Sequence, residues 1–374
     1  MQRPNHYIKA PLNQIPPRLV SLRDYAKEAA DYFRDDIYAY IAGGSGDEHT
    51  LSANTSAFAQ WQIVPRVLND VTGVKTQTKL MGLPFRHPIL LAPVAFQTLA
   101  HPEGEAATAE AANVLETGMV VSTLSSLPME QLAQQLEQPK GFQLYFQADK
   151  NYTLSLVKRA EAAGFDYIVF TVDAPIHGIR NRAQRAGFNL PDGVSAVNLY
   201  DRPELPRQSL TPDQSIVLQG MMSEAPTWDD LAWLIENTTL PVVVKGILHP
   251  DDTKRAQTLG AAGVIVSNHG GRVLDTAPPA LDMLPSIRKA VGPDFTVILD
   301  GAVTRGTDVL VALALGANAV MLGRPQLYAL AVAGALGVAH MLRLIREEFE
   351  VALALSGVSS MSELNEYCLR PCRP

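Results

Sequence analysis

Gly263-Val264-Ile265-Val266-Ser267-Asn268-His269-Gly270-Gly271-Arg272 is the most informative stretch of this sequence. Its first four residues form an apolar run without a polar interruption, which predicts a short strand buried on both faces, as in a parallel sheet. An imidazole and a guanidinium follow at once, three residues apart, on backbone that two glycines make permissive. The stretch therefore predicts a buried strand whose end carries an acid–base group beside an anion-binding group.

Similar apolar runs recur from about residue 88 onward. Segments with helical periodicity or composition separate them, among them Glu103–Thr117, Tyr152–Ala163, Trp228–Ile235 and Asp251–Leu259. Eight buried strands that alternate with helices predict an α/β fold, the (β/α)8 or TIM barrel. The eight predicted strands are Pro88–Leu91, Met119–Ser122, Phe142–Phe146, Tyr167–Val172, Val242–Lys245, Gly263–Ser267, Phe295–Leu299 and Ala319–Leu322.

The length of 374 residues suits one large domain, because barrels of this kind often exceed the size of an average domain. We expect a single domain over residues 1–374, with the barrel at 85–350. Residues 1–80 contain predicted helices at Leu22–Tyr32 and Asp35–Ile41 and are interpreted as a helical cap. Residues 174–226 are too long for an ordinary loop after the fourth strand, and their polar, proline-rich middle, Tyr200–Gln208, predicts a flexible lid over the active site.

Composition excludes several classes of protein. Apolar residues make up 47% and charged residues 18% of the chain, which is typical of a globular protein, and a net charge of −7 argues against a nucleic-acid partner. The first residues lack the apolar core of a signal peptide, and residues 325–342, although free of charged side chains, contain Pro325, Gly334 and Gly337 and favour a buried helix over a membrane span. We therefore expect a soluble, cytoplasmic protein without a membrane partner.

A metal site is not expected. Cys368 and Cys372 form a pair near the end of the chain, too few ligands for a structural zinc site, and are interpreted as reduced thiols.

Polar residues end most of the predicted strands. In a parallel barrel, the carboxyl ends of all strands meet at one rim, where active sites lie. A single His or Asp at such a position also fits a purely structural role. Convergence of five strand ends, however, favours an active site. These residues are Gln143, Tyr145, Thr171, Asp173, Lys245, Ser267, His269, Arg272, Asp300, Gly301, Ala302, Gly323 and Arg324.

The glycine-rich loops after the seventh and eighth strands indicate a phosphate site. Backbone N–H groups at such loops bind anions, and Arg324 with Thr304 or Arg305 lies close in sequence. Tight turns without a ligand are the alternative.

These residues, and the Ser-Asn-His-Gly-Gly-Arg motif above all, resemble the FMN-dependent (S)-2-hydroxy acid oxidase and dehydrogenase family, which includes glycolate oxidase, lactate oxidase and mandelate dehydrogenase. The resemblance extends from about Tyr38 to Ser360. It implies an enzyme that oxidises a 2-hydroxy acid to a 2-oxo acid with FMN as its cofactor. A homotetramer is also implied.

The resemblance assigns a role to each catalytic candidate. His269 resembles the base that takes a proton from the substrate, and Asp173 resembles its orienting partner. Tyr145 would hydrogen-bond the substrate hydroxyl or the developing carbonyl. Lys245 resembles the lysine that faces the N1–C2 edge of the flavin, where its charge favours reduction.

Substrate and cofactor contacts are implied in the same way. Arg272 and Arg180 resemble the clamp on the substrate carboxylate, with Tyr40 as a further donor, and Leu124 would lie over the substrate. The groups expected to line the isoalloxazine or to hold the ribityl chain and phosphate are Pro93, Val94, Ala95, Ser122, Gln143, Thr171, Lys245, Ser267, Asp300, Gly301, Ala302, Arg305, Gly323 and Arg324.

Three positions refine the prediction. The family commonly has two arginines after the seventh strand, where this chain has Thr304 and Arg305, so phosphate affinity is reduced unless Arg305 compensates. Leu124 stands where glycolate oxidase has tryptophan, which favours L-lactate or a longer aliphatic or aryl acid over glycolate. Ala95 is typical of the oxidases, which favours O2 as the acceptor and H2O2 as the product.

Two alternatives remain open. One is a dehydrogenase of the L-lactate or mandelate type with a non-oxygen acceptor, although residues 190–225 lack the long apolar insertion of membrane-bound members. The other is an FMN barrel with isomerase activity, or one that binds flavin without catalysis. An isomerase or a non-catalytic flavin-binding barrel would not need the combination of Arg180, Arg272, His269 and Asp173.

Overall fold

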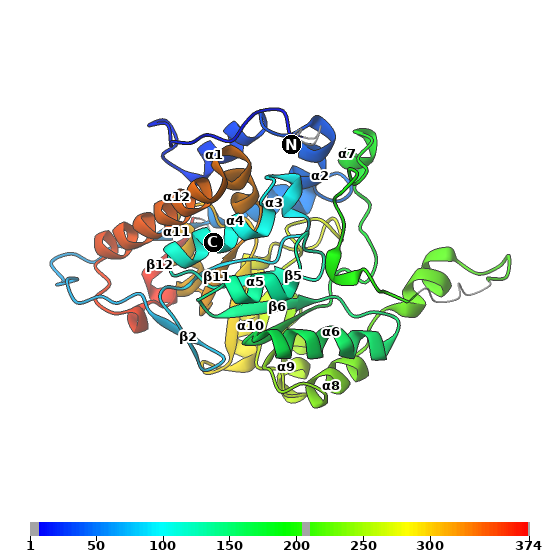
Figure 1. The fold of residues 1–374 in the computed structure, drawn as a ribbon. Helices are drawn as coiled ribbons and strands as arrows, with labels where there is room; N and C mark the ends of the chain where they lie inside the picture. The colour runs from blue at the N-terminus through cyan, green and yellow to red at the C-terminus, as the bar shows by residue number, and fades with distance from the viewer. Residues whose placement is uncertain (1–6, 204–209, 373–374) are drawn as a thin grey trace.

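A closed barrel of eight parallel strands forms the body of the protein (Figure 1). The computed structural model describes residues 7–203 and 210–372. Around the barrel the strands follow the order β10-β11-β4-β5-β6-β7-β8-β9. Strand β9 in turn pairs with β10, which closes the sheet. This confirms the (β/α)8 fold. The strands are β4 (Ile89–Leu91), β5 (Met119–Ser122), β6 (Lys140–Leu144), β7 (Tyr167–Thr171), β8 (Val242–Ile247), β9 (Gly263–Val266), β10 (Thr296–Asp300) and β11 (Ala319–Leu322).

Six of the eight strands begin or end at other residues than predicted, each by at most two residues. Strand β6 begins two residues earlier than expected and ends at Leu144, and β10 extends one residue further, to Asp300. Apolar runs mark where both faces are buried, but the hydrogen-bonded ladder also accepts polar residues whose side chains face the barrel axis. Asp300, predicted to follow its strand, is therefore the last residue of β10.

Side chains alternate along each strand between the barrel axis and the surrounding helices. Phe142, Leu144 and Phe170 pack between the barrel and the helices. The inward residues of the lower and middle barrel are apolar and fully buried, and include Leu90, Val120, Val169, Val243, Ile265 and Ile298.

Helices cover the barrel on all sides (Figure 1). Four of them were predicted with ranges and are present, with ends displaced by up to three residues: α4 (Gly104–Val114), α6 (Lys150–Ala163), α8 (Trp228–Glu236) and α9 (Pro250–Thr258). The others are α5 (Met129–Gln135), α10 (Ala280–Val291), α11 (Gly306–Ala314) and α12 (Arg324–Ser356).

Helix α12 contains the uncharged stretch that the sequence placed inside the protein. Among the described residues it is the one helix whose length and composition would suit a membrane span, yet 67% of its most apolar window is buried against the rest of the protein. Non-helical backbone at Ala333 and Gly334 divides it into two helices. A core helix explains both observations.

The cap before the barrel is not purely helical, which corrects the prediction for residues 1–80. Helices α1 (Leu22–Ala29) and α2 (Asp35–Ala42) were predicted, and an unpredicted helix, α3 (His49–Phe58), follows them. Strand β1 (Trp61–Ile63) pairs with β12 (Leu369–Pro371) near the other end of the chain. The hairpin of β2 (Thr78–Leu80) and β3 (Leu83–Phe85) brings Leu80 and Phe85 into the interior cluster of the barrel.

The segment after β7 contains more local structure than a loop. It includes α7 (Asn181–Arg185), the short helical turns η2 (Val197–Leu199) and η4 (Met221–Glu224), and a π-helical turn, η3 (Ile216–Gly220). Figure 1 shows the green segment with these last turns extending away from the barrel. Residues 204–208 of the proline-rich stretch lie outside the described residues. That this segment acts as a flexible lid stays a prediction.

Candidate active site

The uppermost inward layer of the barrel is polar. Period-two alternation from the apolar interior residues places one polar side chain at the carboxyl end of each of six neighbouring strands, β5 to β10. All of them are buried. These residues are Ser122, Gln143, Thr171, Lys245, Ser267 and Asp300.

Lys245 is a buried cation in this layer with a carboxylate partner. Its Nζ lies 2.8 Å from Asp300 Oδ2 and donates to Ser267 Oγ at 2.9 Å. Burial lowers the pKa of Lys245, but Asp300 and Asp173 outweigh burial, so the pKa lies above its usual value. Lys245 therefore keeps its positive charge at the floor of the site.

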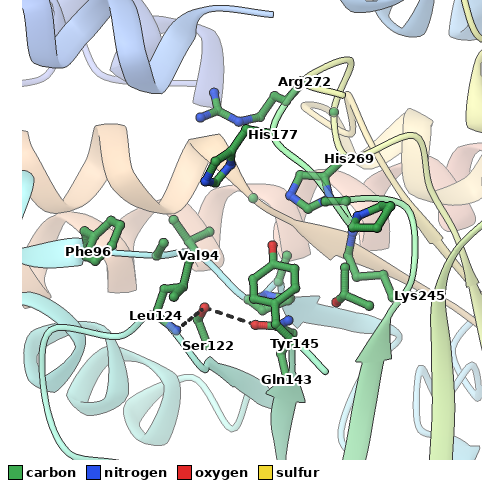
Figure 2. A pocket seen from close by; sticks show the side chains of 18 of the residues that line it. Val94, Phe96, Ser122, Leu124, Gln143, Tyr145, His177, Lys245, His269 and Arg272 are labelled. Atoms are coloured by element: carbon green, nitrogen blue, oxygen red, sulfur yellow. Dashed lines mark hydrogen bonds between the residues drawn. The ribbon is translucent and has the colours of Figure 1, made fainter. Parts of the chain in front are cut away.

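A cavity of about 680 Å³ opens above this layer. It brings together side chains from the cap, five strands of the barrel, the loops that follow strands and the segment after β7, and Figure 2 shows how several of them point into it. The predicted site residues that line it are Tyr40, Pro93, Val94, Ala95, Ser122, Leu124, Gln143, Tyr145, Thr171, Arg180, Lys245, His269, Arg272, Asp300, Gly323 and Arg324.

His269 and Asp173 form a hydrogen-bonded pair. His269 Nδ1 lies 2.9 Å from Asp173 Oδ1, and the imidazole lines the cavity while the carboxylate is buried behind it. Burial raises the pKa of Asp173, but His269 and Lys245 outweigh it, so the pKa lies below its ordinary value. An ionised Asp173 accepts from Nδ1–H, which leaves Nε2 of a neutral His269 as the proton acceptor.

The loop that carries His269 turns through left-handed backbone. His269, Gly270 and Gly271 have φ of 58°, 64° and 72°. A Cβ at Gly271 would lie 2.7 Å from the backbone N of Leu51, and one at Gly270 would lie 2.9 Å from Arg324 Nη1. Both glycines are therefore needed because the loop approaches other groups too closely for a side chain.

The first two residues of the motif hold this loop in place. Ser267 Oγ accepts from the His269 backbone N–H at 3.0 Å. The side-chain amides of Asn268 and Asn54 exchange two hydrogen bonds, of 2.7 and 2.8 Å, which tie the loop to α3 of the cap. Buried amide pairs of this kind fix a single geometry, since breaking one leaves polar groups unsatisfied.

Arg272 is a buried guanidinium without a carboxylate partner among the described residues. Its Nη1 donates to the carbonyls of Tyr40, Ile41 and Gly43 at the end of α2, the negative end of that helix. No described residue accepts from its Nε and Nη2. Burial, followed by the charges of Arg324 and Arg180, lowers the pKa of Arg272 to about 9. An unpaired, destabilised cation of this kind is an anion-binding group.

Arg180 and Tyr40 stand beside Arg272. Both guanidiniums lie over the Tyr40 ring, at 5.7 Å for Arg180 and 5.1 Å for Arg272. Phe188 stacks on the Tyr40 ring at 4.1 Å. These contacts orient two cations toward one space, as binding of a planar carboxylate requires.

Tyr145 is a neutral donor in the cavity. Burial, and then the charge of Asp173, raises the pKa of its hydroxyl above its usual value. The hydroxyl therefore stays protonated near neutral pH and can donate to a substrate oxygen.

Two predicted cofactor residues, Ser267 and Arg305, line neither this cavity nor the smaller one beside it. Ser267 is fully buried below it, where it joins Lys245, Asp300 and the His269 backbone. Arg305 lines no described cavity, because its Nε pairs with Glu348 Oε2 at 3.2 Å on α12. This arrangement gives no support to compensation for the missing arginine by Arg305.

His177 was missed by the sequence analysis. It lines the cavity from the segment after β7, and in Figure 2 it lies between Arg272 and the Val94–Leu124 side. Burial, followed by the charges of Arg180 and His269, lowers its pKa. It lies six residues after the end of β7, within the segment interpreted as a lid, and the residues predicted at this strand end stop at Asp173. The segment also contributes an apolar wall that was not predicted, of Phe188, Leu190, Leu199 and Met221.

Buried polar atoms show that a polar ligand fits this cavity. Gln143 Nε2 and Thr171 Oγ1 are buried in the polar layer without a hydrogen-bond partner. A buried polar atom without a hydrogen bond destabilises the fold, and the donor and acceptor edge of a flavin ring would give both atoms a partner. A second cavity of about 190 Å³ lies beside the first and is lined by Gly301, Ala302, Gly323 and Arg324, as expected for the ribityl phosphate. The residues present therefore fit FMN.

Comparison with known proteins agrees with this geometry. The profile of the FMN-dependent dehydrogenase family matches residues 29–371. The chain belongs to this family. It is an enzyme with FMN as its cofactor, and the resemblance to the FMN-dependent 2-hydroxy acid oxidases is confirmed.

Relatives of this FMN-dependent dehydrogenase family member cover nearly its whole length. An L-lactate oxidase of Alicycliphilus denitrificans is 46% identical over 97% of this chain and 99% of its own. Glycolate oxidase 3 of Arabidopsis thaliana is 40% identical over 93% and 95%. A crystal structure of mandelate oxidase with (S)-2-phenylpropionate superposes with a TM-score of 0.85 at 41% identity, covering 94% of this chain and 98% of that one.

Proposed function

We propose that this enzyme oxidises (S)-2-hydroxy acids to 2-oxo acids, with O2 as the final acceptor and H2O2 as the second product. One observation carries the proposal. Two guanidiniums that no carboxylate of the described residues pairs with, Arg272 and Arg180, face the same cavity as an imidazole that a buried carboxylate orients. A carboxylate and a neighbouring C–H or O–H bond are the groups that this set recognises.

The protein side chains would act in a definite arrangement. Arg272 and Arg180 hold the substrate carboxylate, which fixes the hydroxyl-bearing carbon below His269. Tyr145 donates to the substrate oxygen. His269 Nε2 takes a proton, and Asp173 stabilises the imidazolium that forms. The reaction removes two electrons and two protons from the substrate, and one O2 takes them up as H2O2.

Bound FMN supplies the electron acceptor for the first half of this reaction. Lys245 lies in the polar layer on which the flavin ring would rest, together with Gln143 and Thr171. Its fixed charge would stabilise negative charge at the ring edge, a role that is electrostatic and not acid–base.

The substrate class follows from the wall opposite the cations. Leu124, Val94 and Phe96 line this part of the cavity, and the segment after β7 adds Phe188 and Met221. These apolar side chains favour a 2-hydroxy acid with an apolar substituent, such as L-lactate or a longer aliphatic or aryl acid, over glycolate. The names of the relatives, L-lactate oxidase and mandelate oxidase, support this class.

Ala95 supports the choice of oxygen. It lines the cavity next to Val94, at the position where the oxidases of the family have alanine. A dehydrogenase of the L-lactate or mandelate type would use another acceptor.

The proposal is tested by the flavin spectrum of the purified protein. Without air, L-lactate, longer-chain L-2-hydroxy acids or (S)-mandelate should bleach the flavin more readily than glycolate, and air should restore it with one H2O2 per turnover. A flavin that no 2-hydroxy acid bleaches would contradict the oxidation. Bleaching followed by slow recovery in air, but rapid recovery with a dye, would instead identify the dehydrogenase.

We also propose a homotetramer, as the family resemblance implies, and a cytoplasmic location, as the first residues of the sequence suggest. Light scattering on the purified holoenzyme, and fractionation of the source cells, test the two parts separately.

A further inference from the structure

The smaller cavity lies between the cap and the barrel. Its barrel side is formed by the loops after β10 and β11, Gly301–Thr304 and Gly323–Pro325. Its cap side is formed by α1, through Leu22, Arg23 and Ala26, and by α3. Because this cavity borders the flavin cavity at Asp300, Gly323 and Arg324, it suits the phosphate of FMN.

The charges around this cavity favour an anion. Three charged side chains line it: Arg23, Arg324 and Asp300. Asp300 is already neutralised by Lys245, whose Nζ lies 2.8 Å from its Oδ2. Two guanidiniums therefore remain, beside the loop and helix start whose N–H groups are suited to a phosphate.

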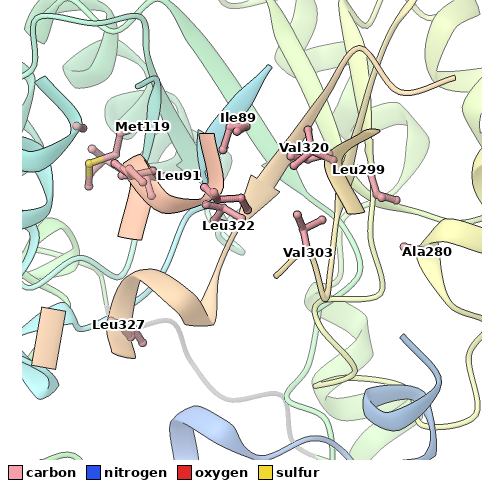
Figure 3. Close-up of a cluster of buried hydrophobic side chains, with 14 of the residues drawn as sticks. Ile89, Leu91, Met119, Ala280, Leu299, Val303, Val320, Leu322 and Leu327 are labelled. Atoms are coloured by element: carbon pink, nitrogen blue, oxygen red, sulfur yellow. The ribbon is translucent and has the colours of Figure 1, made fainter. Parts of the chain in front are cut away.

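The loop after β10 contributes no cation. Val303 is 2% exposed and belongs to the buried cluster that contains Leu299 and Val320, so the loop is anchored (Figure 3). Thr304, where the family commonly has arginine, donates its hydroxyl to Asp308 Oδ2. Arg305 turns away to Glu348.

Arg324 is constrained by its neighbours. Its Nε, Nη1 and Nη2 each donate to a backbone carbonyl, those of Ile41, Gly270 and Gly43. Burial lowers its pKa. With one arginine constrained and the other replaced by Thr304, the barrel by itself is poor in positive charge at this cavity.

Arg23 is the other guanidinium that lines the smaller cavity. Its side chain is exposed at the cavity, and no hydrogen bond or ion pair joins it to another described residue. Burial raises the pKa of Asp308, and the positive charge of Arg23 lowers it in part. Because Asp308 accepts hydrogen bonds from the backbone of Thr304 and Arg305, the charge of Arg23 is felt at the loop after β10. The backbone of Arg23 is well fixed, because Leu22 and Tyr25 are buried and the Tyr25 hydroxyl lies 2.9 Å from His340 Nδ1 of α12.

We propose that Arg23, on helix α1 of the cap, supplies the second cation of the phosphate site and so makes the cap a part of FMN binding. The guanidinium compensates for Thr304 from the opposite wall of the cavity. A phosphate dianion between Arg23 and the loop would also give Arg23 the partner that it lacks. The inference rests on FMN as the cofactor and not on the identity of the hydroxy acid.

Riboflavin provides the decisive comparison, because it has the same ring and ribityl chain without the phosphate. Full-length protein freed of flavin is titrated with FMN and with riboflavin by fluorescence quenching. Arg23→Ala should weaken FMN about tenfold, as expected for one charge-assisted hydrogen bond, and leave riboflavin binding unchanged. Arg23→Lys should restore most of the FMN affinity.

Two controls separate this role from general effects. Lys27→Ala removes a cation from the same helix that does not line the cavity, and Arg305→Ala removes the arginine paired with Glu348. Both should bind FMN as the unchanged protein does. The ³¹P resonance of bound FMN should shift in Arg23→Ala and not in the controls.

The result that overturns the proposal is equally specific. If Arg23→Ala binds FMN as tightly as the unchanged protein, or weakens FMN and riboflavin equally, Arg23 does not contact the phosphate. Since both readouts are binding measurements, they are independent of whether the enzyme oxidises any hydroxy acid tested.

Discussion

His269 Nδ1 and Asp173 Oδ1 lie 2.9 Å apart although 96 residues separate them in the chain. Gly246 makes room for this pair, since a Cβ there would lie 2.4 Å from Asp173 Cβ. Asp173 is thus enclosed between the loop of His269 and the end of β8. The pair forms only when β7, β8 and β9 are neighbours in the barrel.

Replacing His269 with Gln should abolish oxidation without loss of the cofactor. The His269 side chain hydrogen-bonds only Asp173 among the described residues, so the cofactor site should stay intact. Proton transfer by a positioned base contributes about 10²- to 10⁴-fold to a rate, and glutamine cannot supply it. Anaerobic flavin reduction in a stopped-flow instrument measures the step. Reduction at the rate of the unchanged enzyme would show that another group is the base.

Asp173→Asn should slow flavin reduction by about a hundredfold or more, because an amide cannot stabilise the imidazolium that forms. The lowered pKa of Asp173 adds a dependence on pH. A carboxyl with a lowered folded-state pKa stabilises the fold above its unfolded pKa and loses this contribution as the pH falls through the folded value. Thermal unfolding should therefore show a smaller loss of Tm between pH 7 and pH 3 in Asp173→Asn than in the unchanged protein. An equal loss of Tm in the variant and in the unchanged protein would show that the Asp173 carboxylate does not stabilise the fold in this way.

Arg180→Lys should raise KM by at least about tenfold with a smaller change in kcat, since an ammonium cannot pair bidentately with a carboxylate. Steady-state kinetics with L-lactate measures both constants. A change confined to kcat would argue against a binding role.

Binding of a 2-oxo acid should stabilise the protein at neutral pH and lose this effect at high pH. The pKa of Arg272 is lowered to about 9, so the guanidinium is charged below that pH and loses its proton as the pH rises through it. The increase in Tm that pyruvate produces should be full at pH 7 and smaller at pH 10. An increase that does not change with pH would contradict the loss of charge at Arg272 in this pH range.

Leu124→Trp should shift the preference toward small substrates. An indole in the cavity would occupy the space beside Val94 and Phe96. The ratio of kcat/KM for glycolate to that for (S)-mandelate should rise by at least about tenfold, within the range that steric exclusion supplies. Leu124→Met, of similar volume, is the matched control and should leave the ratio unchanged.

Lys245→Met should destabilise the fold by about 3–5 kcal/mol, because it leaves Asp300 buried without its cation. The double variant with Asp300→Asn removes both charges and should recover much of this loss. Denaturant unfolding of the single and double variants measures the difference. Equal stability of the two would contradict the pairing.

The amino-acid sequence by itself determined the architecture and the chemistry at the strand ends. Uninterrupted apolar runs such as Gly263–Val266 predict strands buried on both faces, and eight of them separated by helices fit one closed sheet. Because the carboxyl ends of parallel strands meet at one rim, polar residues that end these runs, such as Lys245 and Thr171, could be predicted to lie at the same site.

Only the tertiary structure decided which cations remain free. Arg305, Arg272 and Arg23 have the same side chain but different surroundings. Arg305 pairs with Glu348, Arg272 donates to carbonyls at the end of α2, and Arg23 lines the smaller cavity with no hydrogen bond or ion pair to another described residue. The position of His177 in the cavity depends on the path of the segment after β7, which no local pattern reports. Local patterns report burial and backbone geometry, whereas the partner of a charge depends on segments that are distant in the chain and meet only when the barrel closes.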